Sequence, residues 1–275
     1  MANLRVVYNN AADRATLTAT AGVGTLVAAN LLTDVKSEVW RTSTTTAQII
    51  MTWPASEMTG VVSLPFTSLS QTATIRVRGY AEVSDAAAAV DTGIILACPV
   101  GIGAWNWGTT PLGVNAYAYA GSSYAVAWFV QTFVKKLVID IVDSSNRLGY
   151  IESARIVTGA YWSPLNNADY GAQLSMVDLS KHERSDAGDL RTDRGSMHKK
   201  LSLDLTLMPA EDRNIIWDIS RINGMSKPLF LSLSPESGDV LEEQTFQIYG
   251  KLTQQSSIRY QFANQFNTSL DLEEV

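Results

Sequence analysis

The sequence predicts a mainly β protein of two domains, a β-sandwich or jelly roll over residues 1–165 and a second β-sandwich with one flanking helix over residues 166–275. Three observations predict it. Polar turns cut the first part into short β-like runs, residues 201–207 alternate strictly between apolar and polar, and residues 209–223 carry a helical period. A change in composition near Pro164 places the domain boundary.

Short runs of β-forming residues define the first domain. They are Arg5–Tyr8, Gln48–Trp53, Gly60–Leu64, Thr72–Tyr80 and Lys136–Val142. Several short strands joined by polar turns are typical of a β-sandwich or jelly roll. We expect Trp40, Trp53, Trp128 and Trp162 to lie in the core or at the domain junction, because buried tryptophans are more common than exposed ones that bind ligands.

The clearest pattern in the second domain is a leucine-rich strand. One face carries Leu201, Leu203, Leu205 and Leu207, and the other carries Ser202, Asp204 and Thr206. Because successive side chains of a strand point to opposite faces, the leucine face is predicted to be buried and the other face polar.

A helix is predicted directly after this strand. Pro209 suits a first helical turn, and Glu211 and Asp212 place negative charge near the positive end of the helix dipole. Gly224 can adopt the left-handed conformation that ends a helix. The stripe that packs on the sheet is formed by Ile215, Ile216, Ile219 and Ile222.

The remaining second-domain elements are predicted as strands and one turn. The strands cover residues 228–234, residues 245–252 and the region of Leu270 and Leu272, and the turn covers residues 235–239. No helix is expected among them.

Composition limits the classes of partner. Charged residues make up only 17% of the 275 residues, so the surface is either rich in neutral polar groups or partly covered by other subunits. Residues 1–165 hold ten basic and ten acidic residues, and residues 166–275 hold eleven and seventeen, so the net charge of −6 lies in the second part. Without a basic surface, sequence-specific nucleic-acid binding is not expected.

The single cysteine and the short apolar runs indicate where the protein is expected to be located. Cys98 cannot form an internal disulfide and is expected to be a small buried hydrophobe. The N-terminus lacks the pattern of a signal peptide, and no run of 18 apolar residues exists. We expect a soluble protein without membrane insertion.

Residues 181–200 are predicted to be a charged loop with a role in assembly. Ten of the twenty are Lys, Arg, Asp or Glu with both signs mixed. Such a long loop is either functional or disordered. Pairing with a neighbouring subunit would set register, whereas isolated exposed ion pairs contribute only about 0–1 kcal/mol, so plain mobility is the alternative. The candidate assembly residues are Arg184, Asp186, Asp189, Arg191, Asp193, Arg194, Lys199 and Lys200.

An enzyme is not expected. His182 and His198 lie in the charged loop near acidic residues, but a loop with glycines offers neither the spacing nor the rigid support of a metal or acid–base site. No serine-hydrolase elbow, zinc-binding helix or phosphate-binding glycine loop occurs in the sequence. We therefore predict no catalytic residue, no metal and no cofactor.

Trp105 and Trp107 are the candidate ligand-contact residues. They share one face if this segment is a strand, and a turn-rich loop follows them. Exposed aromatic pairs stack on sugar rings or anchor protein partners. Packing within the core or between subunits is the alternative, and Tyr117, Tyr119 and Tyr124 carry the same ambiguity.

Two segments of the first domain resemble discoidin-like, galactose-binding-like jelly rolls. Residues 30–42, with Asn30-Leu31 and Trp40-Arg41, resemble a segment near the start of that fold, and residues 136–142 followed by 150–159 resemble its closing strands. The resemblance covers about the first 160 residues. It implies a jelly-roll domain and, as one possible function, a carbohydrate-binding module that contacts host surface glycans.

The whole layout is similar to tail-tip proteins of long-tailed bacteriophages. It combines a jelly roll that ends at residues 155–164 with a strand–helix–strand part that contains residues 227–230 and 247–251, and this second part resembles the tail-tube fold. Distal tail proteins commonly place the tube-like domain first. The order is reversed here, so which ring of the tip the protein forms stays open.

The resemblance to tail-tip proteins implies a structural function in the virion. The protein would form a homo-oligomeric ring, a hexamer, in the tail tip or baseplate and join the tail tube to the hub or receptor-binding apparatus. Its partners would be copies of itself and the tail tube, tape-measure and baseplate hub proteins, after assembly in the host cytoplasm. A surface glycan is the alternative partner.

Overall fold

The structure is a computed structural model that describes residues 3–99 and 123–275. The chain divides into two compact units. Unit 1 comprises residues 1–164 together with Leu229–Tyr249, and unit 2 comprises Leu165–Pro228 and Gly250–Val275. Strands dominate both units, which confirms a mainly β fold. The predicted boundary after residue 165 lies next to Pro164, whereas residues 229–249, expected in the second domain, group with unit 1.

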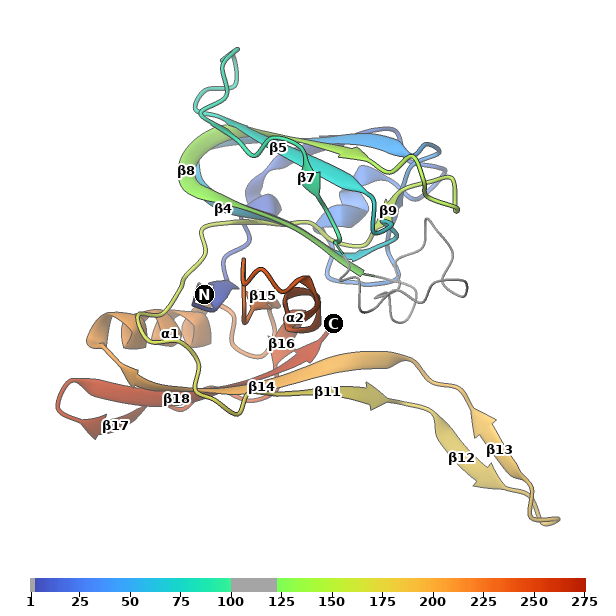
Figure 1. Cartoon of the computed structure of the whole chain (residues 1–275), viewed down its shortest axis with the longest axis vertical. Helices are drawn as coiled ribbons and strands as arrows, with labels where there is room; N and C mark the ends of the chain where they lie inside the picture. Colours follow the sequence, from blue (N-terminus) through green and yellow to red (C-terminus); the bar gives the residue numbers. More distant parts are fainter. Residues whose placement is uncertain (1–2, 100–122) are drawn as a thin grey trace. The chain divides into compact units, whose positions relative to one another are not determined.

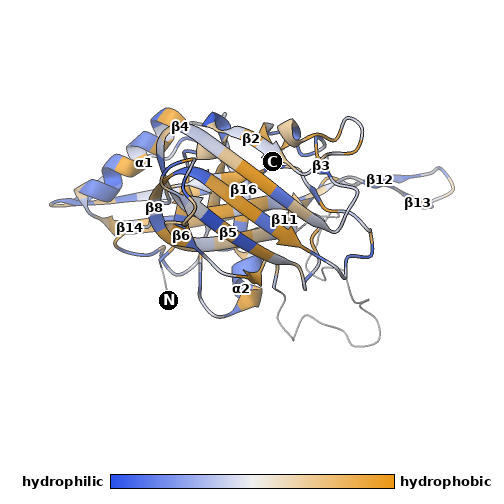
Figure 2. Ribbon diagram, turned by 90° about the horizontal axis from the view of Figure 1, so that it is seen from above, coloured by the Kyte–Doolittle hydropathy of each residue, from blue (hydrophilic) through white to orange (hydrophobic). Residues whose placement is uncertain are grey.

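Unit 1 contains a nine-stranded sheet system. Its strands are β2 (Thr16–Ala19), β3 (Trp40–Arg41), β4 (Thr46–Thr67), β5 (Thr74–Tyr80), β6 (Val90–Asp91), β7 (Ile95–Leu96), β8 (Ser123–Val142), β9 (Glu152–Ser153) and β10 (Val157–Gly159). Two 3₁₀ helices, η1 (Ala11–Arg14) and η2 (Ala28–Leu32), lie in the connections. Apolar and polar residues alternate along β5, as expected for a strand with one buried face (Figure 2).

Two long antiparallel strands build the sandwich of unit 1. The 22 residues of β4 pair with the 20 residues of β8, and the register breaks between Thr52 and Glu57. Before the break β4 pairs with residues 136–142, and after it with residues between 123 and 134. Both strands bend there and so contribute to both layers (Figure 1). The sequence predicted two short runs because exposed residues 54–56 interrupt the apolar pattern at the bend.

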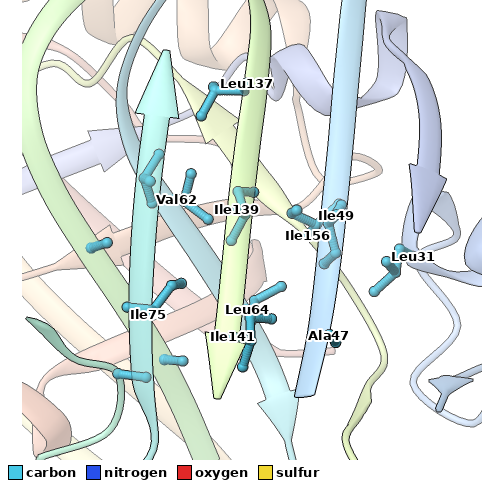
Figure 3. Close-up of a cluster of buried hydrophobic side chains, with 14 of the residues drawn as sticks. Leu31, Ala47, Ile49, Val62, Leu64, Ile75, Leu137, Ile139, Ile141 and Ile156 are labelled. Carbon is cyan, nitrogen blue, oxygen red and sulfur yellow. The ribbon is translucent and has the colours of Figure 1, made fainter. Parts of the chain in front are cut away.

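The core of unit 1 lies between the two halves of these bent strands. Ile49 and Val62, from opposite halves of β4, belong to one buried cluster with Ile139 from β8 and Ile75 from β5 (Figure 3). Trp40, Trp53 and Trp162 are buried, as predicted. Cys98 is buried as well, and burial raises the pKa of its thiol to about 12. It is therefore a buried hydrophobe, as expected.

Residues 229–249 cover the second half of β4 and β8 within unit 1. They contain β15 (Leu229–Ser232), which pairs with β1 (Arg5–Val7), and the start of β16 (Gln247–Leu252). The Phe230 ring lies 6.3 Å from the Tyr124 ring and 6.2 Å from the Trp128 ring, between centroids. The Phe66 ring of β4 lies 6.3 Å from the Tyr249 ring, so this segment helps to bury both faces of β4 from Thr59 to Thr67.

A short helix in this covering segment was not predicted. α2 (Val240–Thr245) begins after Asp239, whose carboxylate accepts hydrogen bonds from the backbone N–H groups of Leu241 at 2.9 Å and Glu242 at 3.2 Å. Asp239 therefore caps the helix. The sequence interpretation assigned Asp239 to a turn and overlooked its role as a cap.

Unit 2 is built on one antiparallel sheet covered by one helix. The strands are β11 (Gln173–Asp178), β14 (Met197–Met208), the end of β16, β17 (Arg259–Phe262) and β18 (Gln265–Glu274). The strand order β16-β18-β14-β11 leaves β17 paired with the first part of β18. Apart from a separate two-stranded pair within residues 181–193, unit 2 holds one sheet and no second layer of strands, because residues 229–249, expected in the second sandwich, group with unit 1.

The helix of unit 2 agrees with the prediction. α1 (Ala210–Ile222) follows Pro209, contacts β14 and β18, and has Ile216 and Ile219 buried. Gly224 has a φ of +50°, the left-handed conformation expected where the helix ends.

The strand before this helix departs from the prediction at one residue. Leu201, Leu203 and Leu205 are buried, but Leu207 is 47% exposed. The pairing of β14 with β18 shifts between Leu205 and Met208, and Leu207 has a φ of +53°. This β-bulge moves Leu207 off the buried face and places Met208 there instead.

Candidate functional site

A two-stranded arm projects from the sheet of unit 2. β12 (Lys181–Arg184) pairs antiparallel with β13 (Leu190–Asp193), and the pair continues from the ends of β11 and β14 (Figure 1). All eight strand residues are exposed. The sequence predicted a loop here, and the structure shows a β-hairpin. We call residues 179–196 the arm.

The cross-strand pairs explain why the arm forms a hairpin. Lys181 lies opposite Asp193 and Glu183 opposite Arg191, so opposite charges face each other on one side of the arm. At the tip, the N–H of Ser185 donates to the carbonyl of Asp189 at 2.9 Å, and Gly188 has a φ of +88° that favours glycine. The Asp186-Ala-Gly-Asp189 turn between complementary charges was the signal that the sequence interpretation overlooked.

Most of the predicted assembly residues lie on this arm or beside it. Those that are exposed are Arg184, Asp186, Asp189, Arg191, Asp193, Arg194 and Lys200. The acids Asp186 and Asp189 occupy the tip, and Lys200 lies on β14 beyond the root of the arm. The structure therefore brings charged groups of both signs together on one projecting element.

Lys199 is the exception among the predicted assembly residues. Its side chain is on the buried face of β14 with Leu201, and the residue is only 5% exposed. Burial lowers the pKa of its ammonium group to about 8, partly offset by the nearby Glu274 carboxylate. Lys199 is thus not a surface contact, because its neighbour Lys200 takes the exposed face of the strand.

The root of the arm is fastened to the sheet. The N–H of Leu179 donates to the carbonyl of Ser196 at 3.1 Å, and the N–H of Gly195 donates to the hydroxyl of Ser180 at 3.0 Å. His198 Nε2 lies 3.0 Å from Glu273 Oε1, an ion-pair distance when the imidazole is protonated. His182 instead has its Nδ1 3.0 Å from the Thr192 hydroxyl, so the two histidines occupy separate environments.

Apolar side chains also lie exposed on the arm and its root. Leu179 is 53% exposed and Leu190 is 55% exposed, and Met176 and Met197 are 46% and 40% exposed. A two-stranded hairpin has no interior in which to bury such groups. The arm therefore presents both charge and apolar surface outward.

A polar cluster fastens the covering segment within unit 1. The guanidinium of Arg155, which is 4% exposed, donates to the Tyr249 hydroxyl at 2.9 Å and to the Asp13 carboxylate at 2.7 Å. The Tyr249 hydroxyl donates in turn to Asp34 at 2.8 Å. Burial raises the pKa of Tyr249 and also that of Asp13, for which the Arg155 charge acts in the opposite direction. The groups bond one another, which suits a structural clamp.

Unit 1 also contains a cavity of about 260 Å³. Its lining includes Trp128, Glu236, Glu243 and Gln244. An aromatic ring, carboxylates and an amide are groups that can contact hydroxyl-rich ligands. The predicted ligand-contact residues Trp105 and Trp107 lie outside the described residues.

The described residues contain no candidate metal site and no helix that could cross a membrane. Within residues 3–99 and 123–275, no group of three or more His, Cys, Asp or Glu side chains could hold a metal ion. Over the same ranges, no helix has both the length and the apolar character needed to cross a membrane.

Comparisons with known proteins assign no family. No family model and no curated protein matches the chain. Among solved structures, it is similar to a Ruminococcus gnavus fucosidase in complex with fucose, with a TM-score of 0.40, 10% identity and coverage of 56% of this chain and 27% of the fucosidase. It is also similar to a chitosan-binding module of a Paenibacillus chitosanase/glucanase, with a TM-score of 0.37, 13% identity and coverage of 55% and 99%.

A fucose-binding module from Streptococcus pneumoniae gives a comparable match. Its TM-score is 0.35 at 9% identity, and the match covers 55% of this chain and 94% of the module. The neighbours are thus sugar-binding modules or a fucosidase. At TM-scores below 0.5 they assign this chain neither a ligand nor a function.

Proposed function

We propose that this protein is a structural subunit that associates with copies of itself through the arm, in a ring at the tail tip or baseplate of a long-tailed bacteriophage. The observation that carries the proposal is the arm itself. It is a hairpin with every strand residue exposed, and it holds mixed charges together with exposed Leu179 and Leu190.

The physical argument concerns what stabilises such an arm. An isolated two-stranded hairpin is marginally stable in water, because it buries little apolar surface. Contact with a second chain would bury its leucines and place its charges opposite partners, which fixes register. The proposal therefore assigns the arm to a contact between subunits.

The placement in a phage tail rests on the sequence. The layout of the chain resembles tail-tip proteins, and a charged content of only 17% suits a surface that neighbours partly cover. In this proposal the ring is a hexamer that joins the tail tube to the baseplate hub. The protein acts by shape and contact and carries out no catalysis.

Shortening the arm tests the proposal. Residues 181–194 would be replaced by an Asn-Gly turn, which closes a two-residue hairpin. Native mass spectrometry of the full chain is expected to show oligomers for the wild type and monomers for this variant. A matched control removes exposed residues from the 84–88 loop of unit 1 and should leave the oligomers intact. A wild-type chain that stays monomeric at every concentration would contradict the proposal.

A second candidate function is binding of a surface glycan by unit 1. It is supported by the sandwich of unit 1, by the cavity lined by Trp128, Glu236 and Glu243, and by the discoidin-like sequence resemblance. A glycan array probed with the full chain tests it. Binding that is lost in Trp105→Ala or Trp128→Ala, with the circular dichroism spectrum unchanged, would favour this function over assembly alone.

A further inference from the structure

We propose that the arm of one copy docks, head to tail, on the polar face of unit 2 of the next copy, at a groove beside β17. This inference rests on the proposed function, since it names the surface that receives the arm. We call this surface the β17 groove. It is lined by Asp169, Asp204, Thr206, Arg259, Asn267 and Ser269, together with Ser257 and Thr268, and has a volume of about 270 Å³.

The first argument is position. The arm leaves β14 at Met197, while Asp204 and Thr206 of the groove lie toward the other end of the same strand, where Met208 pairs with Phe266. At about 3.3 Å per residue, the seven to nine residues from Met197 to Asp204 and Thr206 span roughly 23–30 Å, and the arm points away from these residues (Figure 1). An arm cannot reach the groove of its own sheet at that separation, but a neighbouring copy could present its groove to it. Contacts between different surfaces on each copy generate rings when the rotation closes.

The second argument is charge. Arg259 is exposed, and neither it nor the groove acids Asp169 and Asp204 form an ion pair with another described residue. The arm tip carries the exposed acids Asp186 and Asp189. Placing the tip acids against Arg259, and arm arginines against Asp169 and Asp204, pairs groups that form no ion pair within the described residues of one copy. Such complementarity determines which surfaces recognise each other.

The third argument is the sheet edge. β17 pairs only with β18, so its other side is a free edge within the described residues. Its hairpin exposes Tyr260 at 66% and Phe262 at 60%. A free edge with exposed aromatic residues can pair with a strand of another chain, and natural proteins usually protect such edges. Each of the two arm strands, β12 and β13, has one unpaired outer edge that could pair in this way.

Charge exchange between the two surfaces tests the inference. Arg259→Glu reverses the groove, and Asp186→Lys with Asp189→Lys reverses the arm tip. Each change alone is expected to weaken self-association of the full chain by about tenfold or more, as removal of a central contact does. The two changes combined should recover most of the loss. Analytical ultracentrifugation measures the dissociation constant of each variant.

A matched aromatic pair supplies the control. Phe262→Ala removes an exposed ring on β17, the strand that carries Arg259, and should weaken association. Trp217→Ala removes a ring of 63% exposure on α1, outside the groove, and should have no effect. Because both side chains are exposed, neither change should unfold the chain.

The outcomes separate the inference from the proposed function. If the shortened arm abolishes oligomers while Arg259→Glu and Phe262→Ala leave the dissociation constant unchanged, the arm docks elsewhere and the inference is wrong. If the combined charge reversals fail to restore association, a direct contact between the arm-tip acids and Arg259 is also contradicted. A monomeric wild type would overturn both the inference and the proposed function.

Discussion

The polar cluster of unit 1 and the arm of unit 2 use charged residues in opposite ways. Arg155 is 4% exposed and bonds Asp13, Tyr249 and Asp34 of its own unit. Arg184 and Arg191 on the arm are exposed, and their strands bury nothing. The contacts of Arg155 stabilise unit 1 internally. The arm, by contrast, buries no side chains of its strands unless a neighbouring chain contacts it. Substitutions in the polar cluster should therefore change the stability of the fold, and substitutions on the arm should change self-association.

The largest expected effect compares two arginines. Arg155→Met removes the guanidinium that fastens residues 229–249 and should lower the free energy of unfolding by about 3 kcal/mol. This value is the lower end of the range for a broken buried ion pair, because Asp13 and Asp34 are partly exposed. Arg191→Met should change it by less than about 0.5 kcal/mol. Urea unfolding followed by fluorescence measures both. Equal effects would remove the contrast between the two regions.

The next effect concerns Lys199 at the root of the arm. Its pKa is about 8 in the folded chain, against 10.5 for an ordinary lysine side chain. Between these two values the unfolded chain binds one more proton at this residue, so the stability of the wild type rises with pH there, by up to about 1.4 kcal/mol per pH unit. Below pH 8 this contribution is constant.

Lys199→Met should remove this rise. The difference in unfolding free energy between the wild type and the variant, measured from pH 7 to pH 10.5, isolates Lys199 from the other groups that titrate in the range. A difference that is the same at every pH would show that Lys199 is not held in a costly buried position. Lys200→Met, on the exposed face of the same strand, is the control and should give no such slope.

The smallest effect concerns the cap of α2 in unit 1. Asp239→Ala removes the side chain that accepts from Leu241 and Glu242 N–H groups, and should lower the free energy of unfolding by about 1 kcal/mol. Asp239→Asn keeps the accepting oxygen and should retain most of the stability. Thermal unfolding of both variants checks this, and a loss as large for Asn as for Ala would argue against capping.

Local sequence patterns predicted the parts of the fold that local physics determines. The alternation of Leu201, Leu203 and Leu205, the helix after Pro209 and its end at Gly224 all depend on neighbours within a few residues. The bulge that exposes Leu207 depends on the partner strand β18, so alternation alone placed this residue on the wrong face.

Tertiary contacts decided what the sequence could not predict. The grouping of residues 229–249 with unit 1 depends on contacts of Phe230 and Tyr249 with residues more than 90 positions away. The arm was predicted as a loop because its strands carry no buried face, and hydrophobic alternation is the usual signal of a strand. The candidate charges lie on the arm or beside it, apart from Lys199, whose burial follows from its register with Leu201. Their role in assembly stays a prediction.

Hydrogen exchange of the arm amides in the free chain and in the assembled state tests the central claim most directly. If the arm is completed by a neighbouring copy, residues 181–193 should exchange at least about tenfold more slowly in the assembly, while the core strands of unit 1 stay unchanged. Equal exchange of these residues in both states would contradict a role for the arm in joining subunits.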